Sequence, residues 1–161
     1  AMQTVVVRLA NAIGAPTAKD INCWMLVVND LCKQAALDRR LVIRGPSSGV
    51  RNFITMTDVC MGLEFLVTNR RDRLHPLICN LGDKTKTIGD IASAIKSIYL
   101  EEKGMDLEII ELSNDRSETR NLDFRSSVLA NMGYQWSSNF RQELIELVNF
   151  CEFEFGERNE N

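Results

Sequence analysis

The chain contains two short segments dominated by apolar residues, TVVVRL at positions 4–9, with three successive valines, and PLICN at positions 76–80. Uninterrupted apolar runs of this length are typical of strands that are covered on both faces, as in parallel sheets. Residues 41–44 and 52–56 are predicted to form two further strands, and the glycine, proline and serine residues between them predict a hairpin. Residues 107–112 predict one more strand.

Five segments carry apolar residues at every third or fourth position, which predicts amphipathic helices. We expect these helices at residues 19–38, from residue 57 onwards, and at 87–103, 123–132 and 140–155. Thr57 or Asp58 is the expected N-cap of the second helix. Asp90 stands three positions after Thr87, which predicts a capping box at the start of the third helix, and Gly104 is expected to end that helix.

The order of these elements, β-α-β-β-α-β-α-β-α-α, predicts one α/β domain over residues 1–161. No internal repeat, low-complexity stretch or linker divides the chain, and 161 residues are enough for one substantial core. Ala1 before Met2 is typical of an added residue, so residues 1–3 are expected to contain the natural start, and residues 156–161 are expected to fray. The two apolar strands need parallel neighbours, of which the chain supplies few.

Composition narrows the class of protein without proposing a chemistry. Hydrophobic residues make up 45% and charged residues 25%, which is typical of soluble globular proteins. The net charge of -3 gives no basic excess for binding nucleic acid. The apolar runs are too short to cross a membrane, and no secretory leader opens the chain, so we expect no membrane partner.

The cysteines and the single histidine exclude several kinds of site. The five cysteines are widely spaced with no CxxC pair, which argues against a zinc site or a redox dithiol. We expect buried, reduced thiols in a cytoplasmic protein and no metal site. His75 lies in a charged run before Pro76, which favours a solvated loop, and one histidine excludes most histidine-based catalysis.

Four motifs in this order resemble the C-terminal half of the extended short-chain dehydrogenase/reductases, the NAD-dependent epimerase/dehydratase family that acts on nucleotide sugars. RLANAIGAP is similar to the family's R-x-x-N-x-x-G-P, and CNLG, followed by Thr87 and Ile88, is similar to its y-N-l-G step. LVIRG and GVRNFITMTDV together resemble l-x-i-x-G followed by G-x-x-R-D-F-I-x-V-x-D-V. Residues 123–133 resemble the family's D-x-s-k-x-x-x-L-G segment. The motifs are found at residues 8–16, 41–59, 79–88 and 123–133.

The resemblance implies a C-terminal portion of a Rossmann-type fold, with the last parallel strands and a small α/β substrate lobe, and with the N-terminal cofactor half missing. Its function would be to hold a nucleotide-diphosphate sugar in an enzyme that uses NAD or NADP. The chain has no G-x-x-G-x-x-G, the turn that holds a dinucleotide pyrophosphate, and the family's catalytic Tyr-x-x-x-Lys lies upstream of the matched region. We therefore expect no catalytic residue, no cofactor bound to this chain alone and no turnover by it.

Tyr99 and Lys103 are spaced as Tyr-x-x-x-Lys, which places both side chains on one face of a helix. They follow the helix that begins at Thr87, however, whereas the family's pair precedes the strand that corresponds to residues 4–9. No glycine motif upstream would place a nicotinamide beside them. We interpret the pair as a turn of a surface helix.

The resemblance assigns substrate-binding roles to Asn11, Val42, Arg44, Arg51 and Arg116. Arg51 would contact the diphosphate through its planar guanidinium, although without the resemblance it would be read as an exposed hairpin arginine. Val42 and Arg44 lie on the strand that lines the nucleotide base in the family, and an ordinary edge strand is the other reading for them. Asn11 either binds the substrate or caps its own turn.

Two of these assignments depart from the family's pattern. Arg116, with Arg120 as the other candidate, would be a late arginine on the diphosphate, but the family's R-x-G-D is not intact there and a solvated loop is the other reading. Asn52 replaces the aspartate that usually follows Arg51.

A second reading belongs to a different class of protein, a non-catalytic binding or assembly module. In it, strands 4–9 and 76–80 pair with a cofactor-domain chain or with a second copy of this chain, because a bare apolar sheet edge promotes aggregation. A third reading is a degenerate remnant that folds but binds nothing. The sequence alone leaves these readings open.

Overall fold

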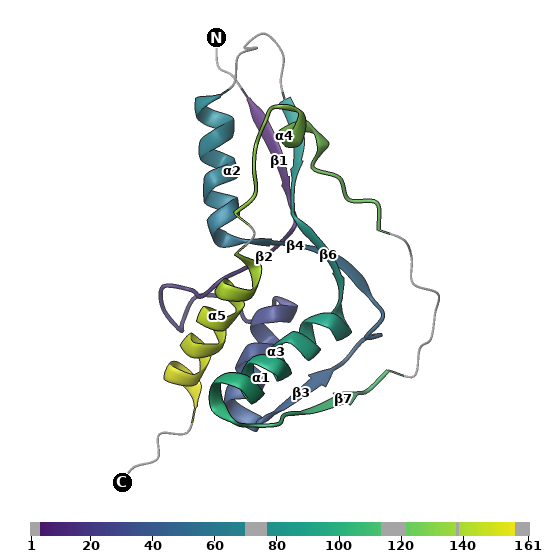
Figure 1. The fold of residues 1–161 in the computed structure, drawn as a ribbon, viewed down its shortest axis with the longest axis vertical. Helices are drawn as coiled ribbons and strands as arrows, with labels where there is room; N and C mark the ends of the chain where they lie inside the picture. Colours follow the sequence, from purple (N-terminus) through teal and green to yellow (C-terminus); the bar gives the residue numbers. More distant parts are fainter. Residues whose placement is uncertain (1–3, 70–76, 114–121, 138, 157–161) are drawn as a thin grey trace.

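The computed structural model describes residues 4–69, 77–113, 122–137 and 139–156, which combine strands and helices throughout (Figure 1). Arg116, Arg120 and His75 lie outside the described residues. The strands are β1 (Val5–Leu9), β2 (Asn11–Ile13), β3 (Arg40–Ile43), β4 (Val50–Thr55), β5 (Leu77–Leu81), β6 (Lys84–Thr87) and β7 (Glu108–Glu111). The helices are α1 (Val27–Asp38), α2 (Met56–Thr68), α3 (Ile88–Lys103), α4 (Ser127–Asn131) and α5 (Phe140–Phe155).

The strands pair mainly in parallel, which confirms the predicted α/β class. β1 pairs with β5 from Val5 opposite Leu77 to Leu9 opposite Leu81, so the two apolar runs of the sequence are neighbours. β4 lies between β2, to which it is parallel, and β6, to which it is antiparallel. β3 pairs in parallel with β7. The predicted hairpin is therefore wrong, because β3 and β4 take their partners from different parts of the chain.

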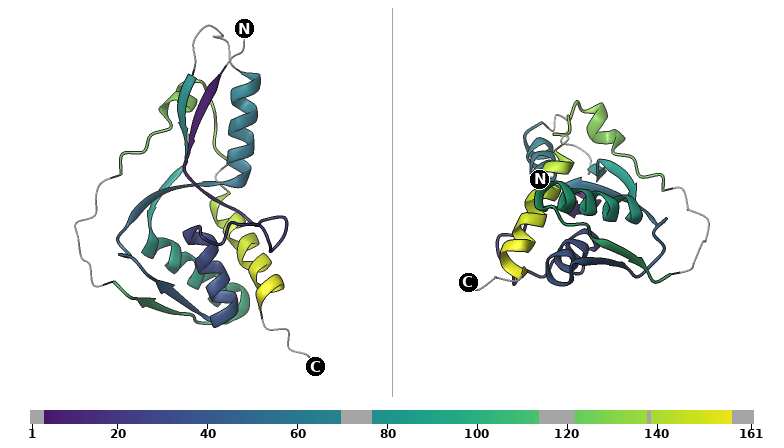
Figure 2. Two further views of the ribbon diagram at one scale, coloured as in Figure 1. Left: turned by 180° about the vertical axis from the view of Figure 1, so that it is seen from behind. Right: turned by 60° about the horizontal axis from the view of Figure 1, so that its bottom comes forward.

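The three-stranded sheet separates two hydrophobic cores. Side chains alternate between the faces of a strand, and accordingly Phe53 of β4 is buried in one core and its neighbour Ile54 in the other. The first core joins α1, α3 and α5, and the second joins α2 and α4 to β1 and β5. Figure 2 shows the two groups of helices from other sides, at opposite ends of the molecule.

The helix ends follow the sequence signals at α3 and at α5, which spans the predicted residues 140–155, and they depart from them at α1, α2 and α4, which begins at Ser127 rather than at residue 123. At α3, Thr87 and Asp90 form the predicted capping box, and Gly104 ends the helix with a φ of 65°. At α2 the N-cap is Thr55, not Thr57 or Asp58, and its hydroxyl oxygen accepts from the Asp58 N–H. Helix α1 begins at Val27 rather than at residue 19, and the Trp24 indole donates to the Lys19 carbonyl at 2.8 Å within the preceding turns.

Gly82 explains why the CNLG motif ends in glycine. A Cβ placed there would lie 2.1 Å from Asn52 Oδ1 and 2.5 Å from Phe124 Cε1. Contacts this short are excluded by van der Waals repulsion, so a larger residue would displace the side chains of Asn52 and Phe124. The motif therefore preserves the close packing of the turn between β5 and β6 against Asn52 of β4 and against Phe124.

One face of the β1–β5 pair is open. Val6 and Ile78 lie opposite each other in the register and are 45% and 56% exposed. The expectation that residues 4–9 are covered on both faces is therefore wrong for the described residues, because only the opposite face, which bears Val5, Val7 and Cys79, packs against α2 and α4. Among the described helices, none is long and apolar enough to cross a membrane.

Candidate functional site

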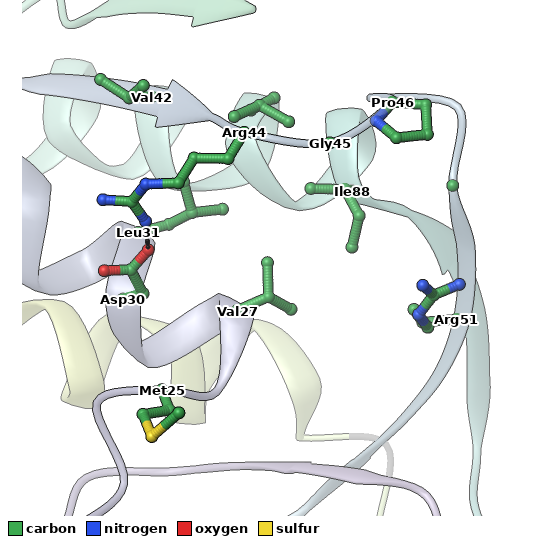
Figure 3. Close-up of a pocket in the computed structure, with 12 residues that line it drawn as sticks. Met25, Val27, Asp30, Leu31, Val42, Arg44, Gly45, Pro46, Arg51 and Ile88 are labelled. Carbon is green, nitrogen blue, oxygen red and sulfur yellow. Dashed lines mark hydrogen bonds and ion pairs between the residues drawn. The ribbon is translucent and has the colours of Figure 1, made fainter. Parts of the chain in front are cut away.

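A pocket of about 300 Å³ opens between α1, β3 and the start of β4. This volume lies at the lower end of the range for small-molecule sites. Three of the residues predicted from the sequence, Val42, Arg44 and Arg51, line the same pocket (Figure 3). The complete lining consists of Met25, Val27, Asp30, Leu31, Val42, Ile43, Arg44, Gly45, Pro46, Gly49, Arg51 and Ile88.

The rim of the pocket is a turn that the start of α3 holds in place. The Gly49 N–H donates to the Pro46 carbonyl at 3.0 Å and closes the turn. The first N–H groups of α3 then donate to this turn, from Ile88 to the Gly49 carbonyl at 3.1 Å and from Gly89 to the Ser47 carbonyl at 2.8 Å. Because these bonds use the free donors of the helix start, the turn is held on a rigid element.

One end of the pocket carries a connected group of polar side chains. Arg44 Nη1 donates to Asp30 Oδ2 at 2.8 Å, and Gln34 Nε2 donates to the same oxygen at 2.8 Å. Gln34 Oε1 in turn accepts from the Val42 N–H at 2.8 Å. Helix α1 and strand β3 thus fix the carboxylate and the guanidinium relative to each other.

Arg51 lies across the pocket from this polar group. Figure 3 shows Asp30 and Arg44 on one side with Leu31 beside them, Arg51 on β4 on the other side, and Val27 and Ile88 between. Arg51 is exposed, and its Nη1 donates to its neighbour's carbonyl, that of Val50, at 2.8 Å. A guanidinium in this position has donors left for a phosphate.

Asn11 does not line this pocket. It begins β2 rather than a turn, and its Nδ2 donates to the Asn52 carbonyl at 3.0 Å, so its amide joins β2 to β4. Asn52 is buried, and its own Nδ2 donates to Thr85 Oγ1 at 3.0 Å on β6. Both asparagines hold together the sheet next to the pocket, and a substrate contact by Asn11 stays a prediction.

Tyr99 and Lys103 link two helices. The Tyr99 hydroxyl donates to Glu152 Oε1 of α5 at 2.6 Å, and Lys103 Nζ donates to Asn149 Oδ1 of the same helix at 3.1 Å. Burial first, and the Glu152 carboxylate second, raise the pKa of Tyr99 far above its ordinary value. Tyr99 is 0% exposed, so the surface interpretation is wrong for it. Both hydrogen bonds join α3 to α5, so the pair has a structural role among the described residues.

The cysteines match the predicted environment only in part. Cys32, Cys79 and Cys151 are buried, and burial raises the pKa of each thiol, that of Cys151 to about 12. Cys60 is exposed and Cys23 is partly exposed, so the expectation of burial is wrong for these two. Among the described residues, no three His, Cys, Asp or Glu side chains are placed to hold a metal ion.

The described residues do not fit the pyrophosphate of a nicotinamide dinucleotide. Such a group binds free N–H donors at a helix start that follows a strand. Two helices directly follow strands here, α2 and α3. The first N–H groups of α2 donate to Glu143 and Thr55, and those of α3 donate to the 46–49 turn and Thr87.

The sequence interpretation missed Asp30, Gln34 and Ile88 as parts of the site. The spacing of Asp30 and Gln34 at i and i+4 was the only local signal, since it places them on one helix face. Their approach to Arg44 depends on how α1 packs against β3.

The sequence matches no protein-family model and no curated protein. The fold, in contrast, is similar to solved structures over most of the chain. RMD from Pseudomonas aeruginosa, complexed with NADPH, aligns with a TM-score of 0.73 and 19% identity over 92% of this chain and 48% of its own. UDP-glucuronic acid 4-epimerase from Bacillus cereus, in complex with UDP-4-deoxy-4-fluoro-glucuronic acid and NAD, aligns with a TM-score of 0.70 and 18% identity over 92% and 45%.

dTDP-glucose 4,6-dehydratase from Bacillus anthracis, in complex with NAD, aligns with a TM-score of 0.64 and 21% identity over 93% of this chain and 44% of its own. The chain thus spans slightly less than half the length of these structures. At this identity the comparison establishes the fold alone, and it confirms the predicted fold class, because the chain has the α/β fold of about half of each of these structures.

Proposed function

We propose that this chain, which has the fold of about half of an extended short-chain dehydrogenase/reductase, is the substrate-binding part of an NAD(P)-dependent nucleotide-sugar epimerase or dehydratase. The observation that carries the proposal is that Val42, Arg44 and Arg51, which one motif assigns to the substrate, line one pocket. The Bacillus cereus epimerase supports it, since its structure contains a UDP-sugar derivative together with NAD.

The pocket suits a nucleoside diphosphate in its chemistry. Its apolar walls, which include Val27, Leu31 and Ile88, would hold a flat heterocycle. Arg51 would bind phosphate oxygens through two parallel N–H donors. Binding energy from this remote part of the substrate would hold the sugar in place at the reacting centre.

Catalysis requires groups that the described residues do not provide. NAD(P) supplies the hydride transfer in enzymes of this fold, and no residue described here fits its pyrophosphate. Tyr99 and Lys103 are held in structural hydrogen bonds. We therefore expect this chain alone to bind the nucleotide sugar, to bind neither NAD nor NADP, and to show no turnover. We also propose a cytoplasmic location, since five unpaired cysteines suit a reducing compartment.

Substitution of Arg51 by alanine tests the proposed site. Titration calorimetry of the chain with UDP-, GDP- and dTDP-sugars should show binding of at least one of them. Arg51→Ala should weaken that binding about tenfold or more, because a hydrogen bond to a charged group contributes roughly 1.5–3 kcal/mol.

Arg141→Ala is the matched control, because Arg141 is exposed, pairs with Glu101 and does not line the pocket. We expect it to bind like the unmodified chain. Folded protein that binds none of the three classes of nucleotide sugar, or an Arg51→Ala variant that binds as well as the control, would contradict the proposal.

A second function, an assembly module, is favoured by the open face of the β1–β5 sheet. This sheet has two strands among the described residues, and Val6 and Ile78 expose apolar surface side by side. We propose that a cofactor-domain chain or a second copy of this chain pairs with an edge of this sheet and also covers its open face. The proposal is compatible with the first, because the pocket lies at the other end of the molecule.

Analytical ultracentrifugation tests the assembly. We expect the chain to self-associate or to bind a separately produced cofactor domain, and we expect Val6→Lys to abolish that association, since a charge would be buried in the new contact. Val67→Lys is the control, because Val67 is 83% exposed on α2, away from this face. A stable monomer in which the amides of residues 4–9 are fully protected from hydrogen exchange would refute the assembly.

A further inference from the structure

The Asp30–Arg44 pair gives one end of the pocket both an acceptor and a donor. Arg44 Nη1 donates to Asp30 Oδ2 at 2.8 Å, and the two side chains are 69% and 31% exposed. A surface pair of this kind contributes little to stability. Its position in the lining of the pocket, however, presents two opposite charges to a bound molecule.

The carboxylate is held in one orientation. Gln34, which is only 8% exposed, donates to Asp30 Oδ2 at 2.8 Å and accepts from the Val42 N–H at 2.8 Å. Both contacts to the carboxylate are thus made to the same oxygen, and Asp30 Oδ1 accepts no hydrogen bond from the described residues. An ionised carboxylate oxygen can accept at least two such bonds, so acceptor capacity is left for a ligand.

On the basis of the proposed function, we propose that Asp30 and Arg44 read the base of the nucleotide and that this base is guanine. The Watson–Crick edge of guanine carries two adjacent donors, N1–H and the N2 amino group, beside the O6 acceptor. Asp30 Oδ1, with its two acceptor positions open, can accept from both donors, and Arg44, with five donors in all, can serve O6. The two side chains therefore complement guanine along its whole edge.

The other bases match this pair less well. Uracil and thymine have a single N3–H between two carbonyl oxygens, and these oxygens would face the carboxylate. Adenine and cytosine offer one amino group next to an unprotonated ring nitrogen, which would also face it. Each of these bases leaves an acceptor opposite an acceptor, and unpaired polar groups in a binding site reduce affinity strongly.

The rest of the pocket agrees with this orientation. Val27 from α1 and Ile88 from α3 lie between the Asp30–Arg44 pair and Arg51, and Leu31 of α1 lies beside the pair (Figure 3). A purine ring among these apolar side chains would direct its edge to the pair and its ribose diphosphate towards Arg51. The charges agree with this orientation, because the Asp30 carboxylate would accept from the base and the Arg51 guanidinium would face the phosphates.

Titration calorimetry of the full chain with GDP, IDP, UDP, dTDP, CDP and ADP tests the assignment. We expect GDP to bind about 10- to 100-fold more tightly than UDP, the range for one bidentate base contact. IDP lacks only the N2 amino group, so it should bind more weakly than GDP by about tenfold. This comparison needs no variant and therefore does not depend on whether a variant folds.

The variant Asp30→Asn examines the residue itself. It replaces one acceptor oxygen by an amino group, so GDP should bind at least about tenfold more weakly and its advantage over UDP should disappear. Asp38→Asn is the control, because Asp38 is exposed on the same helix and does not line the pocket. Circular dichroism and thermal unfolding would establish that both variants are folded.

The outcomes separate this inference from the proposed function. If nucleoside diphosphates bind but GDP has no advantage, or IDP binds as tightly as GDP, the guanine assignment is wrong and the nucleotide site stands. If Asp30→Asn folds and keeps the preference for GDP, Asp30 does not read the base. If none of the six nucleotides binds, both the assignment and the proposed function are overturned.

Discussion

Replacing Asp58 with alanine is expected to lower the free energy of unfolding by about 3 kcal/mol or more, since each buried donor left unpaired costs roughly 1–3 kcal/mol. Asp58 is 0% exposed. Its carboxylate accepts from the Ser137 N–H at 2.7 Å, the Ser137 hydroxyl at 2.9 Å, the Thr55 hydroxyl at 2.9 Å and the Tyr134 hydroxyl at 3.3 Å. One side chain thus joins the start of α2 to the segment between α4 and α5.

Urea denaturation followed by circular dichroism measures this loss. Glu64→Ala is the matched control, because Glu64 is an exposed carboxylate on the same helix, and it should change the free energy by less than about 0.5 kcal/mol. Asp58→Asn should lose an amount of unfolding free energy between those of Asp58→Ala and Glu64→Ala. Its amide keeps one acceptor oxygen, but its amino group faces the N–H and O–H donors that the second oxygen accepts from in the unmodified chain. A loss below about 1 kcal/mol for Asp58→Ala would mean that water replaces the carboxylate without a large cost.

Local structure was the part of the fold that the sequence predicted well. The apolar runs at 4–9 and 76–80 correspond to β1 and β5, and the capping box at Thr87 is present as predicted. These features depend on residues within a few positions of each other, so their signals are contained in short segments. The predicted start of α1 is wrong because Trp24 packs against the first core without being part of a helix, while Ile21, Met25 and Leu26 are exposed.

Strand pairing could not be read from the same signals. Strand β3 pairs with β7, which lies more than 60 residues away in the sequence. Strand β4 lies between β2, where the sequence predicts a turn, and β6, for which it predicts no element. Side-chain alternation shows that a strand has a buried face, but it does not name the neighbour that covers its edge. The glycine, proline and serine turn before β4 is equally compatible with a hairpin and with the strand change that the structure shows.

The candidate site divides in the same way. Val42, Arg44 and Arg51 lie within ten positions of one another in one motif, and all three line the same pocket. Comparison of that motif with the family's pattern was therefore enough to select them together. Asp30 comes from a different element and reaches Arg44 only because α1 packs beside β3. The residue that carries the guanine assignment was therefore invisible to motif comparison, since its role arises from a tertiary contact.

Replacing Glu143 with alanine is the second large expected effect. Glu143 lies on α5 but accepts from the first N–H groups of α2, from Met56 at 2.9 Å and from Thr57 at 3.2 Å. It is 7% exposed, so the freed donors would have little access to water. We expect a loss of about 3 kcal/mol, because hydrogen bonds to a charged group contribute roughly 1.5–3 kcal/mol each and the helix dipole favours an anion there.

The contribution of this cap can be separated from the packing of α5. Glu146→Ala removes an exposed carboxylate from the same helix and should be nearly neutral, whereas Glu143→Gln keeps one acceptor and should lose about half as much as alanine. Hydrogen exchange locates the effect, since the amides of Met56 and Thr57 should exchange faster in Glu143→Ala while those of α5 stay protected. Unchanged exchange at these two amides, together with a loss equal to that of Glu146→Ala, would show that α2 does not depend on a cap from α5. A loss confined to α2 would instead establish that the two hydrophobic cores are joined by this carboxylate, which lies where the helices of both meet the central sheet.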